Sequence, residues 1–567
     1  MLTKQGNLPG GRALDRIGRA PSRASSVKLA AVAAREPFLR IPPFPGARVS
    51  TFSRAEGSKV DSASLAATLR KLRVGGTYWA AQPRLPTGHV LVRSWAAAEA
   101  ACRLFPDHPV VLWNRVLELG HGVLDIAVVS GECDPWHMVG GATALVTDSS
   151  DELRMVAALL DVPCHELRSP KEAVRVHPEV GSFVEGLAEQ SFQNPFTALP
   201  MDAIEAAELC GFWRQLIDAN RNLAGGVGFA FWKQDHVAPL LWGGTAPFRF
   251  LRSGDVTDAE HAVAMWRAKA APALVAELER AGHQLIEVED GFLRSRGLGA
   301  DCIPPLSITV DRLGPHFDPK QASELEILLE KAEFDQATID RARQLRSVIV
   351  AAGIGKYERG TAQIDRPAGK RRHILVPGQV EDDRAVKAGG CGLTSNLELL
   401  KRVREQAPDA YILYKPHPDV LAGHRRGGIP EAACLRYADE IVGHLPIASL
   451  IAMVDEVHVN TSLAGFEALL REKPVTTYGV PFYAGCGLTH DLGPVPARRT
   501  AQRNVDELVA ATLLLYPRYL DPVTGLPCPA EVVVERLSGS HEADAGLIVG
   551  MRRLQGKLMR RLRSLVQ

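Results

Sequence analysis

Residues 456–485 read EVHVNTSLAGFEALLREKPVTTYGVPFYAG, and this stretch decides the fold class. A strand pattern at 456–459 is followed by the helix-capping residue Ser462, a helical pattern over 463–471 and a second strand pattern at 475–478. A strand, a helix and a strand within roughly thirty residues are typical of a parallel βαβ unit. The stretch therefore predicts a layered α/β protein.

The same alternation extends outward along the chain. Further strands are predicted at 248–251, 284–288, 347–351, 373–376 and 411–414, and nearer the N-terminus at 110–113, 126–130 and 144–147. Helical patterns lie between them, at 152–160, 259–281, 323–333 and 396–406. This alternation predicts doubly wound sheets, whose ligands bind at the carboxyl ends of the strands.

The composition fits several domains of this kind. The 567 residues are 46% hydrophobic and 23% charged, and about 150 residues per domain predicts three or four domains. Lys and Arg total 66 against 65 Asp and Glu, so no nucleic-acid partner is expected. Nine cysteines without a C-x-x-C pair favour reduced thiols and a cytoplasmic location. Without an apolar run of 18 residues, no transmembrane helix is predicted.

Five regions are predicted along the chain. They are a disordered basic tail (1–60), an N-terminal α/β domain (65–200), a first Rossmann-like domain (225–365), a second, nucleotide-binding domain (370–540) and a basic amphipathic C-terminal helix (541–567). The last helix has leucines on one face among basic residues, so it either lies against an anionic membrane surface or docks on its own domain. The first reading predicts peripheral contact with the inner membrane.

A first polar cluster follows the strand predicted at 284–288. It contains Glu289, Asp290, Arg294 and Arg296. Two carboxylates and two arginines in eight residues either pair with one another in a turn or bind a ligand. The planar guanidinium of arginine suits a carboxylate or a phosphate.

A second cluster, Glu381, Asp382 and Asp383, follows the strand predicted at 373–376. Consecutive carboxylates repel one another, and three interpretations stay open. The acids cap the N-terminus of a helix, or Asp382 and Asp383 bind Mg²⁺ or Mn²⁺ beside a diphosphate. Alternatively, Asp383 is a nucleophile or a general base.

A third cluster, Lys415-Pro416-His417-Pro418-Asp419, follows the strand predicted at 411–414. The prolines stiffen the backbone on both sides of His417, which suits a residue that must be aimed. Lys415 and His417 are suitable partners for a phosphate group. The alternative is a structural histidine. The histidines lack the tight spacing of zinc ligands, so no zinc site is expected.

A fourth cluster follows the strand predicted at 456–459. Thr461 or Ser462 caps a helix whose free N–H groups favour an anion such as phosphate. Gly465 thins the first turns, which predicts close approach of a ligand to the backbone. Glu467 is placed to accept hydrogen bonds from ribose hydroxyls. The alternative is simple capping with a surface glutamate.

Together these clusters resemble the bacterial capsule polysaccharide biosynthesis proteins of KpsC type, which are retaining β-Kdo transferases. The resemblance covers roughly 225–520 and is carried by five segments in the family's order: 289–295, 378–383, 415–419, 461–470 and 475–485. It implies a GT-B-like α/β fold in which two Rossmann-like domains face a cleft, with the N-terminal α/β domain in addition. It also implies CMP-β-Kdo as donor and a glycolipid or polysaccharide as acceptor. Because CMP is already a good leaving group and a monophosphate, no cofactor and no metal are expected.

The resemblance assigns roles to residues of this chain. It makes Asp383 the nucleophile, with Glu289 and Asp290 on the opposite wall of the cleft. The nucleotide-binding residues that it implies are Lys415, His417, Thr461, Ser462 and Glu467. From their charge, we assign Arg294 or Arg296 to the donor carboxylate. A carboxylate nucleophile permits retention through a glycosyl-enzyme and two inversions.

The chain departs from the family's pattern at a few positions. Arg384 and Ala385 stand where a small residue and then Ser are common, and Cys486 stands where Trp is usual. Either change is expected to alter the choice of donor or acceptor.

The N-terminal domain carries a faint echo of this pattern, because residues 144–164 resemble 454–475. Region 65–200 is thus either a decayed half-module, which keeps the fold without the chemistry, or an unrelated α/β domain. Two rival functions also stay open. One is a non-catalytic capsule assembly or export factor, and the other is a metal-dependent UDP-sugar transferase acting at Asp382 and Asp383.

Overall fold

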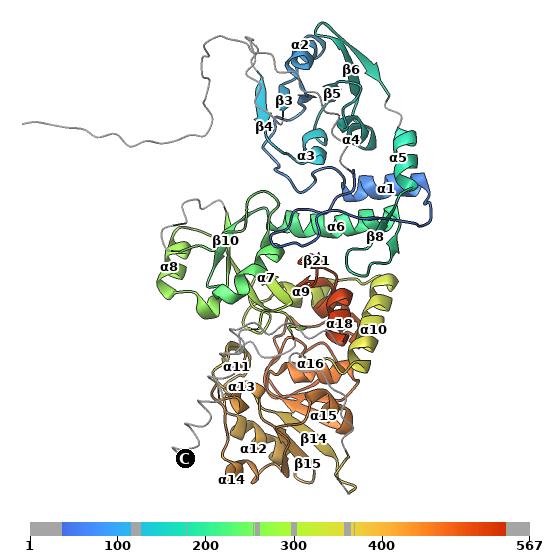
Figure 1. Ribbon diagram of the computed structural model, residues 1–567. Helices are drawn as coiled ribbons and strands as arrows, with labels where there is room; N and C mark the ends of the chain where they lie inside the picture. The colour runs from blue at the N-terminus through green and yellow to red at the C-terminus, as the bar shows by residue number, and fades with distance from the viewer. Residues whose placement is uncertain are drawn as a thin grey trace, which may run out of the picture. The chain divides into compact units, whose positions relative to one another are not determined.

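The computed structural model describes residues 37–114, 126–177, 180–252, 255, 261–295, 303–355, 365–367, 369–423 and 425–539. Within these residues three six-stranded sheets and one small three-stranded sheet are present (Figure 1). The C-terminal helix predicted at 541–567, with its proposed membrane contact, lies outside the described residues. In the described part of the chain, no helix combines the length and the apolar character needed to cross a membrane.

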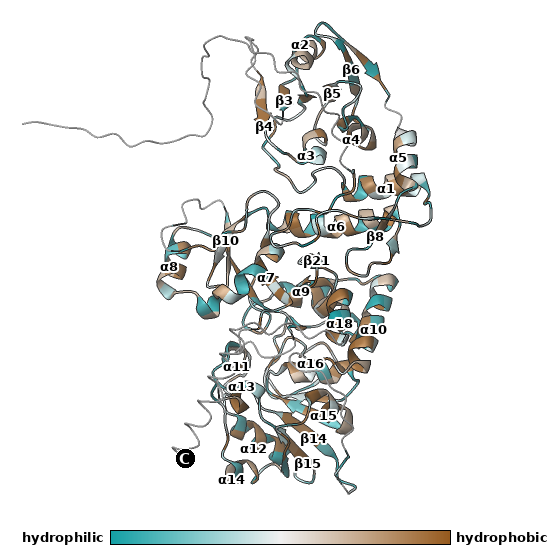
Figure 2. Ribbon diagram, viewed as in Figure 1, coloured by the Kyte–Doolittle hydropathy of each residue, from teal (hydrophilic) through white to brown (hydrophobic). Residues whose placement is uncertain are grey.

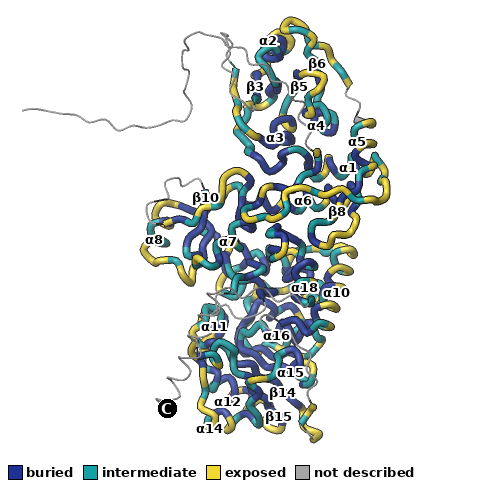
Figure 3. Tube along the Cα trace, in the orientation of Figure 1, coloured by how far each residue is buried: buried dark blue, intermediate teal, exposed yellow. Residues whose placement is uncertain are grey.

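The sheet of the second Rossmann-like domain is parallel throughout. Its strands, in spatial order, are β16 (Glu440–Ile441), β15 (Tyr411–Lys415), β14 (His373–Pro377), β17 (Glu456–Val459), β18 (Val475–Thr477) and β19 (His490–Asp491). Ile374, Val376 and Ile412 are fully buried in its core. Parallel strands that are covered on both faces are apolar in their buried parts, as the centres of β14 and β15 are (Figures 2 and 3).

The sheet of the first Rossmann-like domain combines segments from two parts of the chain. Its order is β10 (Leu223–Val227), β11 (Ala262–Met265), β12 (Leu285–Asp290), β13 (Ser307–Asp311), β20 (Pro517–Leu520) and β21 (Pro527–Cys528). The first three strands are parallel and the last three run antiparallel to their neighbours. The predicted limit of 370–540 therefore needs correction, because β20 and β21 belong to this sheet. The sequence pattern predicts no strand at either position.

The N-terminal domain has the same strand order as the second Rossmann-like domain. Its strands are β4 (Ala127–Ser130), β3 (Val110–Asn114), β2 (Val90–Val92), β5 (Ala144–Thr147), β6 (Cys164–Ser169) and β7 (Glu172–Val176). The helix after β5, α4 (Leu153–Leu159), has Glu152 at its N-cap, where the side chain makes no capping bond. Strand order is shared by many doubly wound folds, so the half-module origin stays a prediction.

Residues 39–55 are ordered, which contradicts the disordered tail predicted for 1–60. Leu39, Ile41 and Phe44 are at most 3% exposed. The Phe44 ring packs edge-on against Trp213 and Trp242. Apolar side chains without a regular period still stabilise an extended segment when other parts of the protein bury them. The local sequence of the segment does not show which distant residues will do so.

Three further elements differ from the prediction. Segment 347–351 is the end of helix α10 (Gln336–Ala351), because its isoleucine continues a buried helical stripe that includes Ala342 and Leu345. Segment 259–281 is not one helix: it contains β11, and α8 (Pro272–Arg280) begins at a proline. Segment 248–251 makes only an isolated bridge, from Phe250 to Gly226.

Candidate active site

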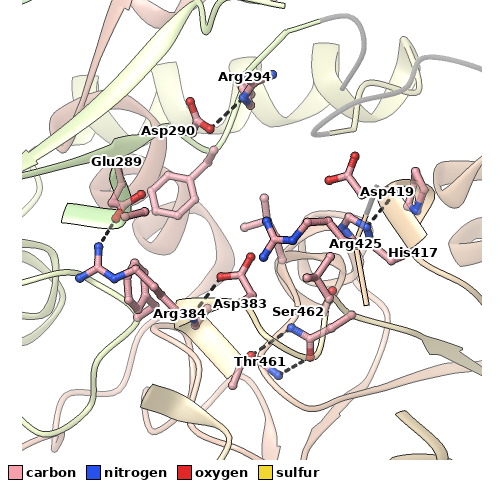
Figure 4. A pocket seen from close by; sticks show the side chains of 18 of the residues that line it. Glu289, Asp290, Arg294, Asp383, Arg384, His417, Asp419, Arg425, Thr461 and Ser462 are labelled. Atoms are coloured by element: carbon pink, nitrogen blue, oxygen red, sulfur yellow. Dashed lines mark hydrogen bonds and ion pairs between the residues drawn. The ribbon is translucent and has the colours of Figure 1, made fainter. Parts of the chain in front are cut away.

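A cavity of about 910 Å³ collects the polar clusters from both Rossmann-like domains (Figure 4). The first domain lines it with the loops after β10 and β11 and with the end of β12. The second domain lines it with the loops that follow β14, β15 and β17. Among the predicted site residues, those that line this cavity are Glu289, Asp290, Arg294, Asp383, Lys415, His417, Thr461, Ser462 and Glu467. Arg296 lies outside the described residues.

Asp383 is held by its own backbone surroundings. It is the N-cap of helix α11 (Arg384–Gly389), where its Oδ1 accepts the N–H of Ala385 at 3.1 Å. Its own N–H donates to the carbonyl of Val380 at 3.1 Å. One carboxyl oxygen is thus committed to the cap, and this bond orients the group at the cavity wall.

The neighbouring carboxylate has a different partner. Asp382 is 46% exposed and its Oδ1 accepts a hydrogen bond from Arg425 at 3.1 Å. Over the described residues, His, Cys, Asp and Glu side chains do not gather in threes around a point suitable for a metal ion. Asp382 therefore pairs with an arginine, whereas Asp383 caps a helix.

A backbone hydrogen bond fixes the role of one ring nitrogen of His417. Its Nδ1 accepts the N–H of Asp419 at 3.1 Å, at the N-cap of α13 (Pro418–Leu421). An acceptor at Nδ1 places the proton of a neutral imidazole on Nε2. His417 therefore offers an Nε2–H donor as well as a capping acceptor, while the flanking prolines restrict its backbone.

Lys415 is buried, at 4% exposure, and supports a neighbouring loop. Its Nζ donates to the carbonyl of Leu445 at 2.5 Å and lies 3.4 Å from that of Gly443. The ammonium group therefore brings positive charge to this wall and also fixes the 443–445 loop.

The loops after β14 and β17 are joined by one amide. The Gln379 side chain donates to Thr461 Oγ1 at 3.0 Å and accepts the Thr461 N–H at 2.9 Å. Ser462 then caps α16 (Leu463–Leu470) by accepting the N–H of Ala464 at 3.2 Å. Glu467 lies in the second turn, buried at 7% exposure, and lines the cavity.

Gly465 does not serve the role predicted for it. The space beside its Cα is filled by the Tyr483 side chain, whose hydroxyl donates to the Ser462 carbonyl at 2.5 Å. The group that lies close to the backbone at Gly465 is therefore the Tyr483 side chain and not a ligand. A glycine is required because any Cβ would collide with the ring and hydroxyl of Tyr483.

We expect Gly465→Ala to destabilise the second domain by about 1–3 kcal/mol, as overpacking of a filled site does. The added methyl group displaces Tyr483 and, through its hydroxyl, the Ser462 carbonyl at the start of α16. Thermal unfolding of the parent and of the variant measures this loss of stability. Tyr483→Phe in the same background removes the closest colliding atom and should recover part of the loss. Unchanged stability of the alanine variant would contradict the packing described.

The wall from the first domain is a charged network along β12. Asp290 forms ion pairs with Lys233 at 3.1 Å and with Arg294 at 3.0 Å. Arg294 is buried and also donates to Ser295 Oγ at 2.8 Å and to the Ile303 carbonyl at 2.9 Å. Its guanidinium is thus engaged within the protein, and its role toward a donor carboxylate stays a prediction.

The pKa of Glu289 on this wall is raised well above the ordinary value of a glutamate. Burial, together with the nearby carboxylates Asp290 and Glu287, raises the pKa of Glu289 to about 7, although the positive charge of Arg384 opposes this shift. A carboxyl group that titrates near neutrality can exchange protons with a substrate at working pH. This is typical of a general acid or base, and the Asp383 carboxyl lines the same cavity.

Three cationic residues that line the cavity, Lys233, Lys269 and Arg425, are not among the residues predicted from the sequence. Lys233 is buried at 6% exposure, and its Nζ lies 3.4 Å from the centre of the Trp266 ring. Its position shortly after β10 was the available signal, since ligands bind where parallel strands end. Arg425 stands in an irregular loop, and no local pattern in the sequence indicated it.

Two Rossmann-like domains that line one cavity with the ends of their parallel strands define the GT-B class of fold. A profile of the family described as "Capsule polysaccharide biosynthesis protein" matches residues 261–519. The β-Kdo 2,7 transferase KpsC of Thermosulfurimonas dismutans, a solved structure, is 34% identical over 56% of this chain and 98% of that one, with a TM-score of 0.45. By sequence, the chain belongs to the capsule polysaccharide biosynthesis protein family of KpsC type, which confirms the resemblance.

Curated relatives agree with this assignment. The capsule polysaccharide modification protein LipA of Neisseria meningitidis serogroup A is 35% identical over 64% of this chain and 54% of the relative. The lipopolysaccharide-processing protein LpsZ of Rhizobium meliloti is 45% identical over 41% of this chain and 54% of the relative. The chain thus spans about half the length of these curated relatives.

Proposed function

We propose that this protein is a retaining glycosyltransferase of capsule or related surface-polysaccharide assembly. In this proposal it transfers Kdo from CMP-β-Kdo to a glycolipid or polysaccharide acceptor, with Asp383 as nucleophile. The observation that carries the proposal is the single cavity that holds Asp383 together with Glu289 of the other domain. The Kdo transferase activity in the name of the 34% identical KpsC protein supports the choice of sugar.

The second domain supplies the groups that a cytidine monophosphate needs. The Nε2–H of His417 and the N-terminus of α16 at Ser462 favour the phosphate. Glu467 accepts hydrogen bonds from ribose hydroxyls, and Lys415 adds positive charge nearby. CMP is a stable leaving group, so stabilising its charge matters more than protonating it.

The proposed chemistry has two displacements. A carboxyl oxygen of Asp383 bonds to the anomeric carbon while the bond to the CMP phosphate oxygen breaks, and CMP departs with the electron pair. The acceptor hydroxyl then bonds to the anomeric carbon, its proton passes to Glu289, and the bond to Asp383 breaks. Two inversions give net retention. The pKa of about 7 at Glu289 suits this proton transfer.

The direct test incubates the purified protein with CMP-Kdo and defined acceptors and follows the product by mass spectrometry. Under this proposal a β-linked Kdo product forms. A non-catalytic assembly factor yields no product with any acceptor. A metal-dependent UDP-sugar transferase yields product from UDP-sugars and loses activity in EDTA. Either of these two results would overturn the proposal.

A further inference from the structure

Arg384 spans the cavity between the two Rossmann-like domains. It is the first residue of α11 and directly follows Asp383. Its Nη1 donates a short hydrogen bond to Glu289 of β12 and lies 3.3 Å from Glu287 Oε2. The guanidinium carbon also lies 5.1 Å from the centre of the Phe317 ring. Figure 4 shows the Arg384 side chain reaching from the Asp383 loop to Glu289.

The charges on β12 explain why this contact matters. Asp290 has two cations of its own domain, Lys233 and Arg294. Glu287 has Arg267 of its own domain in addition to Arg384. Within the described residues, the ion pair of Glu289 is the one with Arg384, which comes from the other domain. The charge balance of Glu289 therefore depends on the position of the Asp383 loop.

We propose that Arg384 is a positioning residue that links the nucleophile loop to Glu289 and sets the protonation of Glu289. This inference rests on the proposed function, in which Glu289 accepts the acceptor's proton. It goes beyond that function because it gives a role to a residue outside the proposed catalytic and nucleotide-binding set. Arg384 acts through Glu289 and not on the sugar.

The groups that face Glu289 predict the direction of each substitution. Burial, Asp290 and Glu287 raise the pKa of Glu289, and Arg384 and Lys233 lower it. Removing the positive charge in Arg384→Gln must therefore raise this pKa above about 7. Removing a like charge in Glu287→Gln must lower it. Arg384→Lys keeps the charge and should keep the pKa close to that of the parent.

The first experiment measures kcat/KM for transfer against pH in the parent and these three variants. The parent rate should rise with pH through about 7, as Glu289 becomes a base. We expect the midpoint to move at least about one unit upward in Arg384→Gln, downward in Glu287→Gln, and little in Arg384→Lys. Equal midpoints in all four proteins, with only the plateau lowered, would show that Arg384 is merely structural and would overturn the proposal.

A second experiment needs no activity and separates this proposal from the proposed function. The pKa of Glu289 is about 7 in the folded state against an ordinary value of 4.5. As pH rises between these values, the unfolded state loses its proton first, so the parent loses stability relative to Glu289→Gln. The gap between their urea midpoints should therefore grow up to about pH 7 and then stay constant.

The same comparison is then made between Arg384→Gln and the double variant that also carries Glu289→Gln. The gap between their urea midpoints should keep growing above pH 7, because the pKa of Glu289 in the folded state is higher without Arg384. A gap that levels off at the same pH in both backgrounds would overturn the role of Arg384, whatever the transfer assay shows. If no sugar is transferred but the levelling-off point moves, the proposed function fails and the link between Arg384 and Glu289 stands.

Discussion

Under the proposed mechanism, Asp383→Ala is expected to lower sugar transfer by at least about 10⁴-fold, because no other group would replace the nucleophile that the proposal assigns to Asp383. The fold should survive, since the lost N-cap costs only about 1 kcal/mol. Asp383→Asn retains an acceptor for the Ala385 N–H and should be equally inactive. Rates of product formation, with circular dichroism and CMP titration for fold and binding, measure these effects.

Asp382→Ala is the matched control for this prediction. Asp382 is the preceding residue, is 46% exposed and contacts Arg425, so its loss should lower transfer less than about tenfold. If both aspartates were metal ligands, both variants would lose activity alike. A Kdo adduct on the peptide that contains Asp383, trapped without acceptor, is also expected. Normal transfer by Asp383→Ala would remove the assignment.

Asp134→Ala is expected to destabilise the protein by about 3–5 kcal/mol, as breaking a buried ion pair does. Asp134 is fully buried, and its Oδ2 accepts hydrogen bonds from Arg214 at 2.6 Å and Gln82 at 2.9 Å. Its Oδ1 caps α3 (Pro135–Val139) by accepting the Trp136 N–H. The substitution leaves the Arg214 charge buried without its main partner. Urea unfolding followed by tryptophan fluorescence measures the loss.

Asp218→Ala is the control here, because Asp218 contacts the same arginine from the protein surface. Its carboxylate is 39% exposed and lies 3.3 Å from Arg214. Because solvent screens this carboxylate, its pair with Arg214 contributes little, and the expected cost is below about 1 kcal/mol. Equal losses in the two variants would contradict the distinction between the buried and the exposed pair.

The strands of the second domain were predictable because they are short, apolar and bounded by polar clusters. The predicted 373–376, 411–414 and 456–459 correspond to β14, β15 and β17 to within a residue. Buried parallel strands have an almost continuous apolar pattern, which local sequence preserves. The clusters that follow them could therefore be assigned to one edge of a sheet.

Elements that depend on distant partners could not be predicted in this way. Strand β20 joins β13 across some two hundred residues of sequence, and the segment 39–44 is ordered by tryptophans far along the chain. Gly465 was interpreted as an opening for a ligand, whereas the Tyr483 side chain fills that space. In each case the stabilising contact comes from a residue that the local pattern does not contain.

By itself, the sequence determined the α/β class, the family and the four polar clusters, because hydrophobic periodicity and short motifs are local properties of the chain. Only the tertiary structure decided which of these charges meet. Arg384 pairs with Glu289 across the cavity, Arg425 pairs with Asp382, and Arg294 pairs with Asp290. Ion pairs, burial and the pKa values that follow from them depend on distances between elements, and those distances exist only after the chain has folded.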